Sequence, residues 1–152
     1  MDLDDLLVPL RATCASMPPL VAMQLELRHF DGQRLYVYAP LAANVNDKGS
    51  AFGGSLSGLM TIAGWGLATL KLQQAGLEAD VYVATSSVRY RAPLLDDLHA
   101  QAWLEPDADW ADFIDTFGRL GKARVPLLAQ VLLPEGGVAA ELSGRYVALA
   151  KG

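Results

Sequence analysis

The feature that most limits how this chain can fold is a run of 22 residues, 49–70, without a charged side chain. The run reads GSAFGGSLSGLMTIAGWGLATL and is long enough to cross a lipid bilayer as a helix. Nine of its residues are Gly or Ser, however, and the segments beyond Leu77 alternate as amphipathic strands do. We therefore expect a helix, ending near Gln74, that is buried on nearly all sides and needs no polar face. Its small residues, Gly58 and Gly64 among them, predict close approach of neighbouring backbone.

Most of the remaining chain has the two-residue periodicity of strands in an antiparallel sheet. Two alternating segments flank Asp31-Gly32, which predicts a β-hairpin with a two-residue turn before the uncharged helix. Four strands are expected after that helix, and Pro126 predicts an edge or a bulge in the third of them. An amphipathic helix with a kink at Pro9 is expected over 2–16. The expected strands are 23–30, 33–40, 79–93, 98–106, 122–134 and 138–150, with a short helix at 107–121.

Length, composition and charge restrict the class of protein. With 152 residues, 52% hydrophobic and 19% charged, the chain is expected to form a single domain over 1–152. Its net charge of −5 argues against a general binder of nucleic acid or of membrane surfaces, because both need a basic face. Met1 leads into DLDD without the pattern of a signal peptide, and the lone Cys14 cannot form an internal disulfide. Both features predict a cytoplasmic protein.

The segment around the start of the uncharged helix carries a specific motif. Residues 44–67 read NVNDKGSAFGGSLSGLMTIAGWGL, a string that resembles the family of putative thioesterases that forms the C-terminal half of the bacterial YiiD protein. The resemblance covers essentially the whole chain. It implies the α+β hotdog fold, in which an antiparallel sheet wraps around one long buried central helix. It also implies a homodimer that has its active sites between subunits and acts on acyl or malonyl thioesters of acyl carrier protein or coenzyme A.

Gly53 and Gly54 are the first candidates for chemistry. A glycine pair at the start of a helix can present unobstructed backbone N–H groups, aided by the positive end of the helix dipole. Aimed at a thioester carbonyl, such donors would stabilise an enolate or a tetrahedral oxyanion. Close packing alone explains the same pair, and the residues by themselves leave both alternatives open. With the resemblance, Gly54 is expected to be catalytic, and Phe52, Gly53 and Ser55 are expected to bind the substrate.

The reaction depends on the polar groups around that carbonyl. Hydrolysis needs a group that activates water, usually a carboxylate or a histidine, and no Asp, Glu or His occurs between Lys48 and Leu77. Compared with better-known hotdog thioesterases, Phe52 replaces a histidine and Thr61 replaces a carboxylate. Decarboxylation of a malonyl thioester needs no base to begin, and members of the similar family have been assigned this activity.

The main expectation is therefore an enzyme that decarboxylates malonyl-acyl-carrier-protein to acetyl-acyl-carrier-protein, which starts fatty-acid synthesis. One alternative is a thioesterase that hydrolyses acyl-coenzyme A or acyl-carrier-protein. A second alternative is a non-catalytic module that binds acyl thioesters. The missing acidic residue on the uncharged helix favours the first and third of these functions over hydrolysis.

Neutral hydrogen-bond donors are expected to complete the site. Asn46 can donate an amide N–H, and Thr61 a hydroxyl, to a thioester or carboxylate oxygen. The resemblance supports catalytic roles for both and a substrate-binding role for Asp47. Turn formation at Asn46 and Asp47, and a Thr61 bond to the carbonyl four residues back, are the structural alternatives. Ser87, on the strand after the helix, is a further substrate-binding candidate that the partner subunit would supply, and an inward hydroxyl in the sheet explains it equally well.

Four basic residues, Arg89, Arg91, Lys122 and Arg124, are candidates for contacting phosphopantetheine or an acidic carrier protein. An ordinary solvated strand face is the alternative explanation. The chain has no Cys/His cluster and no glycine-rich phosphate-binding motif, so neither a metal nor a cofactor is expected.

Overall fold

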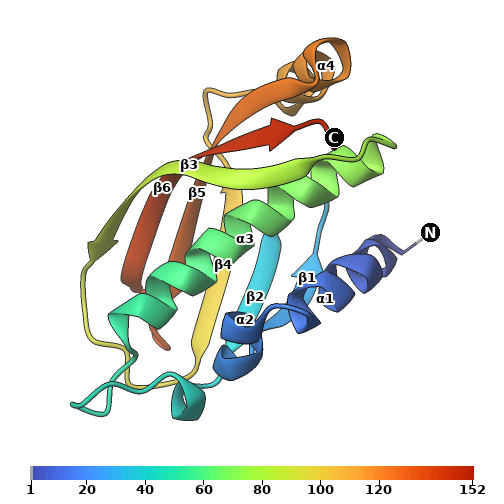
Figure 1. Ribbon diagram of the computed structural model, residues 1–152. Coiled ribbons are helices and arrows are strands. Elements are labelled where there is room, and N and C mark those ends of the chain that lie inside the picture. Colours follow the sequence, from blue (N-terminus) through green and yellow to red (C-terminus); the bar gives the residue numbers. More distant parts are fainter. Residues whose placement is uncertain (1) are drawn as a thin grey trace.

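A computed structural model describes residues 2–152, in which a six-stranded antiparallel sheet packs against one long helix (Figure 1). The strands are β1 (Glu26–Phe30), β2 (Leu35–Ala39), β3 (Asp80–Tyr90), β4 (Leu98–Leu104), β5 (Lys122–Leu132) and β6 (Val138–Leu149). The helices are α1 (Leu7–Ala15), α2 (Pro18–Met23), α3 (Gly53–Gln74) and α4 (Trp110–Leu120), with short 3-10 helices η1 (Leu3–Leu6) and η2 (Leu41–Ala43). The sheet order is β1-β2-β4-β5-β6-β3. This is the α+β hotdog architecture that the sequence predicts.

The central helix α3 buries one side against the sheet and leaves the other partly open. Its large apolar residues Leu59, Met60 and Leu67 are completely buried. Residues spaced three or four apart form a partly exposed, uncharged stripe on the opposite side, which we call the open stripe. The open stripe consists of Gly54, Ser57, Gly58, Thr61, Ile62, Trp65 and Thr69. The expected burial on nearly all sides is therefore incomplete in a single protomer.

The glycines of α3 serve different purposes. A Cβ atom on Gly64 would overlap the ring and hydroxyl of Tyr146, which is completely buried on β6. A Cβ atom on Gly58 would lie 3.7 Å from the sulfur of Met23, an ordinary contact. Gly64 therefore has a close neighbour, but this neighbour is a side chain and not the predicted backbone, and Gly58 has no close neighbour within one protomer. None of the helices in residues 2–152 has the length and apolar character of a membrane span.

A short helix that the sequence analysis did not predict precedes the sheet. Pro18 and Pro19 occupy the first positions of α2, where a missing N–H breaks no helical hydrogen bond. The prolines that end α1 therefore also begin α2, and β1 starts at Glu26 instead of Met23. Pro9 likewise lies in the first turn of α1, directly after η1, where it is tolerated for the same reason.

Two local predictions about strands need correction. Pro126 lies in the central strand β5, not at an edge or a bulge. The Pro126 carbonyl accepts the Glu105 N–H (3.2 Å), which places it on the β4 side of the strand. The nitrogen of a strand residue faces the same side as its carbonyl, so the Pro126 nitrogen points to where β4 has already ended, and no hydrogen bond to β6 is lost. The hairpin turn needs four residues instead of two, because the Asp31 carboxylate accepts the N–H groups of Gln33 (2.8 Å) and Arg34 (2.6 Å).

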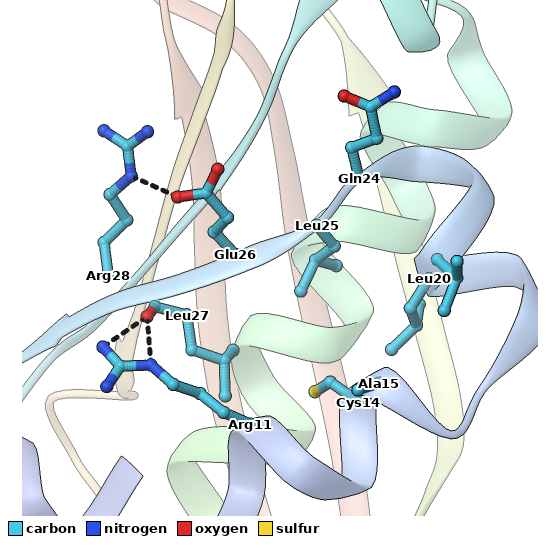
Figure 2. A pocket seen from close by; sticks show the side chains of 10 residues that line it. Arg11, Cys14, Ala15, Leu20, Gln24, Leu25, Glu26, Leu27 and Arg28 are labelled. Atoms are coloured by element: carbon cyan, nitrogen blue, oxygen red, sulfur yellow. Dashed lines mark hydrogen bonds and ion pairs between the residues drawn. The ribbon is translucent and has the colours of Figure 1, made fainter. Parts of the chain in front are cut away.

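The two edges of the sheet are protected differently. On β1, the Arg11 guanidinium donates to the Leu27 carbonyl through Nε (3.0 Å) and Nη2 (2.8 Å), as Figure 2 shows. The Phe30 N–H donates to the carboxylate of Asp4 (2.9 Å). On β3, at the opposite edge, nearly every residue is exposed, including Tyr82 with 55% of its surface. The N-terminal helices therefore block one edge, whereas β3 is open for pairing with another strand.

Candidate functional site

The start of α3 presents two backbone N–H groups without partners. Phe52 is the N-cap residue, and no side chain caps the helix. The Ser55 and Leu56 N–H groups both donate to the Phe52 carbonyl at 3.0 Å. The N–H groups of Gly53 and Gly54 have no acceptor within residues 2–152. At the positive end of the helix dipole, these two donors suit an oxyanion.

Two aromatic rings border the glycine pair. The Phe52 ring is 55% exposed and lies so close to Gly54 that a Cβ there would be 2.5 Å from Cε2. Tyr90 reaches across from the end of β3, and its hydroxyl lies 3.4 Å from the Gly53 carbonyl oxygen, to which it donates. The Phe52 ring explains the missing side chain at Gly54, whereas a Cβ on Gly53 would lie 3.6 Å from the Tyr90 ring, an ordinary contact. The free N–H groups remain available for a ligand. The sequence analysis did not single out Tyr90.

Asn46 is held by the loop that leads into α3. Its Oδ1 accepts the N–H groups of Lys48 (2.8 Å) and Ser50 (3.1 Å), and its Nδ2 donates to Ser50 Oγ (2.9 Å). One amide hydrogen is left over for a ligand. The turn-forming role and the donor role are therefore compatible in one side chain. Asp47, in contrast, is exposed and forms an ion pair with Lys48 (2.9 Å).

Thr61 lies two turns along α3, half-buried on the open stripe. Its hydroxyl donates to the Ser57 carbonyl four residues back (2.8 Å), as the structural alternative predicted. It would have to rotate away from that carbonyl to donate to a ligand. The Thr61 carbonyl accepts the hydroxyl of Tyr146 (3.0 Å), and burial raises the pKa of Tyr146, so this phenol stays protonated. Tyr146 on the sheet therefore holds the backbone of Thr61 in place.

The two predicted serines, Ser55 and Ser87, do not lie on the exposed side of Gly53 and Gly54. Ser55 is only 7% exposed. Ser87 pairs with Ser143 on the face of the sheet that points away from α3. A register shift in β3 between Val83 and Thr85 causes this, because one extra residue turns all later side chains to the opposite face. Without that shift, Ser87 would face the helix. Its predicted role in substrate binding therefore does not arise within one protomer.

Asn44 fixes the start of α3, and the sequence analysis missed it. The side chain is 3% exposed, and Nδ2 donates to the carbonyls of Met23 (2.9 Å) and Pro40 (2.7 Å). Its main-chain carbonyl accepts the Phe52 N–H (2.7 Å). Asn44 thus connects α2, the end of β2 and the N-cap of α3. Its Oδ1 is buried and has no partner within residues 2–152.

A separate cavity of about 550 Å³ lies between α1, α2 and β1 (Figure 2). Cys14, Leu20 and Leu25 are among its lining residues. Burial raises the pKa of the Cys14 thiol to about 11, so it is not a nucleophile at neutral pH. The guanidinium of Arg11 at its margin is already bonded to a backbone carbonyl. The start of α3 therefore remains the candidate site. Across residues 2–152, no cluster of His, Cys, Asp and Glu could hold a metal ion.

A long helix packed on a six-stranded antiparallel sheet is the hotdog fold, and the free N–H groups at the glycine start of this helix can receive a ligand. A family model described as "Putative thioesterase (yiiD_Cterm)" matches residues 10–150. The chain belongs to this family.

Solved structures agree with this assignment. A putative thioesterase from Shewanella oneidensis is 33% identical, with a TM-score of 0.86 and coverage of 96% of this chain and 99% of that one. A protein of unknown function from Chlorobaculum tepidum is 31% identical, with a TM-score of 0.91 and coverage of 99% and 98%. A thioesterase from Haemophilus influenzae is 12% identical, with a TM-score of 0.71 and coverage of 93% and 88%, which shows a shared fold alone.

Proposed function

We propose that this protein binds an acyl thioester whose carbonyl oxygen accepts the N–H groups of Gly53 and Gly54. The observation that carries the proposal is that these two donors are free at the start of a 22-residue helix. Fixed donors aimed at a developing oxyanion contribute strongly, since loss of one typically lowers the rate by ~10²–10³. The exposed ring of Phe52 offers an apolar surface to the acyl thioester.

We infer that the reaction is decarboxylation of a malonyl thioester, with acyl-thioester hydrolysis as the second candidate. The open stripe has no carboxylate or imidazole, and Asp47 in the preceding loop is paired with Lys48. Loss of CO₂ needs only stabilisation of the enolate oxygen, which Gly53, Gly54 and the remaining hydrogen of Asn46 can supply. The family description and the Shewanella relative favour hydrolysis instead. Hydrolysis would need a base from outside this stripe.

One assay separates these reactions. We expect the purified protein to release CO₂ from a malonyl thioester while the thioester bond stays intact. Free thiol should not accumulate from the malonyl thioester or from a neutral acyl thioester. Thiol release from the acyl thioester without CO₂ from the malonyl one would establish hydrolysis instead. Saturable binding of both thioesters without either product would contradict an enzymatic role.

We also propose that the protein is a homodimer formed through β3. The β3 edge is open, whereas α1 and η1 block β1, so strand pairing can occur on one side of the sheet only. Two antiparallel β3 strands about a two-fold axis would close the assembly. The uncharged open stripe of α3 would then face a partner and be covered by it.

Light scattering tests the dimer directly. We expect twice the protomer mass at micromolar concentration. Ser86→Pro, which removes a backbone N–H that faces the open edge of β3, should weaken the dimer, and Thr116→Ala on the distant helix α4 is the control. A wild-type protein that stays monomeric at this concentration would contradict the proposal.

A further inference from the structure

The cavity between α1, α2 and β1 exposes backbone groups of the edge strand. The Leu27 carbonyl points away from β2, because it accepts the Arg11 guanidinium. The Leu25 N–H points the same way and donates to the Leu20 carbonyl on α2 (3.1 Å). In a strand the N–H and the carbonyl of one residue face the same side. The Leu25 carbonyl and the Leu27 N–H therefore face the cavity, which both residues line.

The Leu25 carbonyl and the Leu27 N–H have no partner in the part of the chain that the structure describes, residues 2–152. Leu27 is 3% exposed, so bulk water reaches its backbone poorly. A backbone group that is unpaired in such a place raises the free energy until a partner binds it. The cavity therefore offers a ligand one acceptor and one donor, on either side of Glu26.

These two groups suit a single residue and not a whole strand. Arg11 covers the edge beyond Leu27, and the Leu20 carbonyl already binds the Leu25 N–H, so longer pairing is blocked. One extended residue that runs parallel to β1 can donate its N–H to Leu25 and accept from Leu27. A lone trans amide cannot do both, because its N–H and its carbonyl point in opposite directions. The pattern therefore selects an acylated amino acid residue.

Arg11 supplies positive charge where such a residue would end. It forms no ion pair anywhere in residues 2–152, and its Nη1 has no acceptor there. The Asp4 carboxylate accepts the Phe30 N–H (2.9 Å) and contacts His29 (3.1 Å), and these bonds lower its pKa. Arg11 lowers the Asp4 pKa further by its charge alone, so Asp4 is near Arg11 but is engaged elsewhere. A terminal carboxylate can accept from Leu27 and Arg11 with its two oxygens.

The rest of the cavity is neutral or apolar. Glu26 and Arg28 form an ion pair at 3.2 Å, and Figure 2 shows their side chains on the side of β1 away from Leu27. The volume of about 550 Å³ falls within the ~300–1,000 Å³ typical of sites for small molecules. The apolar wall consists of Cys14, Ala15, Leu20 and Val21.

We propose that this cavity binds an N-acylated amino acid residue with a free carboxylate and an apolar side chain, either as a small molecule or as the last residue of a peptide. Its carboxylate accepts N–H groups of Leu27 and Arg11, and its own N–H donates to the Leu25 carbonyl. Its apolar groups lie against Cys14 and Leu20. The cavity is at the sheet edge opposite β3, so the proposed dimer leaves it open. The inference does not rest on the proposed function, because no thioester takes part.

Ligand variants test each contact without changing the protein. N-hexanoyl-L-leucine should bind with a dissociation constant of about 1 mM or lower and shift the Leu27 amide resonance in an NMR titration. N-hexanoyl-L-leucinamide lacks the charge, and N-hexanoyl-N-methyl-L-leucine lacks the N–H. Each should bind about tenfold more weakly. If either compound binds as tightly as the parent, or if no compound shifts Leu27, the proposal is overturned.

A matched pair of protein variants tests the charge. Arg11→Gln should weaken binding of N-hexanoyl-L-leucine about tenfold and leave binding of the leucinamide unchanged. Unchanged binding of the leucinamide also shows that the cavity persists without the Arg11 contact to β1. Arg28→Gln removes the same charge from the same cavity, but from an arginine that is paired with Glu26, so the affinity should change by less than about twofold. Equal losses in the two variants would contradict a specific carboxylate site at Arg11.

The position and the source of the ligand are measured separately. Nuclear Overhauser contacts should join the leucine methyl groups of the ligand to Leu20 and Val21, and contacts to any other surface instead would overturn the proposal. Tighter binding of acetyl-Ala-Ala-Leu than of N-hexanoyl-L-leucine would support the end of a peptide as the source. The reverse order would support a free N-acyl amino acid. None of these readouts depends on turnover of a thioester.

Discussion

Gly64→Ala is expected to destabilise the protein by about 2 kcal/mol, although alanine is the better helix former. The added methyl group would overlap the Tyr146 ring and hydroxyl. Tyr146 is completely buried and donates to the Thr61 carbonyl, so it cannot move without breaking its own packing and hydrogen bond. For a chain of this size, the melting temperature should fall by roughly 4–8 °C.

Gly58→Ala is the matched control, because it makes the same change in the same helix. Within one protomer, its Cβ would meet only the Met23 side chain at ordinary contact distance. We expect it to stabilise the protein by up to about 1 kcal/mol through helix propensity. Tyr146→Phe, which removes the nearest atom, should reduce the loss caused by Gly64→Ala in a double-mutant cycle. Equal melting temperatures for the two alanine variants would show that Tyr146 does not restrict this position.

Asn46→Asp should lower kcat/KM by about 10² or more while the fold stays intact. The carboxylate can still accept the N–H groups of Lys48 and Ser50, but it has no hydrogen to donate to a substrate oxygen. We expect the melting temperature to change by no more than about 2 °C. Asn46→Ala is less informative, since it also removes three hydrogen bonds of the loop.

Ser50→Ala controls for the loop itself. It removes the hydroxyl that accepts from Asn46 Nδ2 but retains the amide donor. This variant should keep most of the catalytic rate, measured with the same thioester. If Asn46→Asp and Ser50→Ala lose activity equally, then Asn46 acts through the loop conformation and does not donate to the substrate.

Much of the fold could be predicted because each element is periodic along the chain. The uncharged run predicted α3 to its last residue, Gln74, and alternation predicted all six strands. The helix start at Gly53 could be recognised because its pattern is contiguous in sequence. Its two N–H groups are free for the same local reason, since the first turn of any helix lacks internal acceptors.

The parts of the fold and of the candidate site that could not be predicted depend on contacts between distant segments. The open stripe is as uncharged as the buried side of α3, so the sequence could not distinguish the two. Asn44 and Tyr90 acquire their roles only when α2 and β3 arrive beside the start of α3. The face of the sheet on which Ser87 lies depends on the register shift between Val83 and Thr85 in β3, which alternation alone does not indicate.

The strand order has a consequence for how the chain is made. On the ribosome, β3 emerges directly after α3, but its neighbour in the sheet is β6, the last strand to be synthesised. The whole of β4, α4 and β5 must leave the exit tunnel before β3 can pair. The nascent chain therefore carries an unpaired strand beside an uncharged helix from the completion of β3 at Tyr90 until β6 (Val138–Leu149) is made, and such an exposed surface is the kind that chaperones bind. Completion of β6 is the step that ends this exposure.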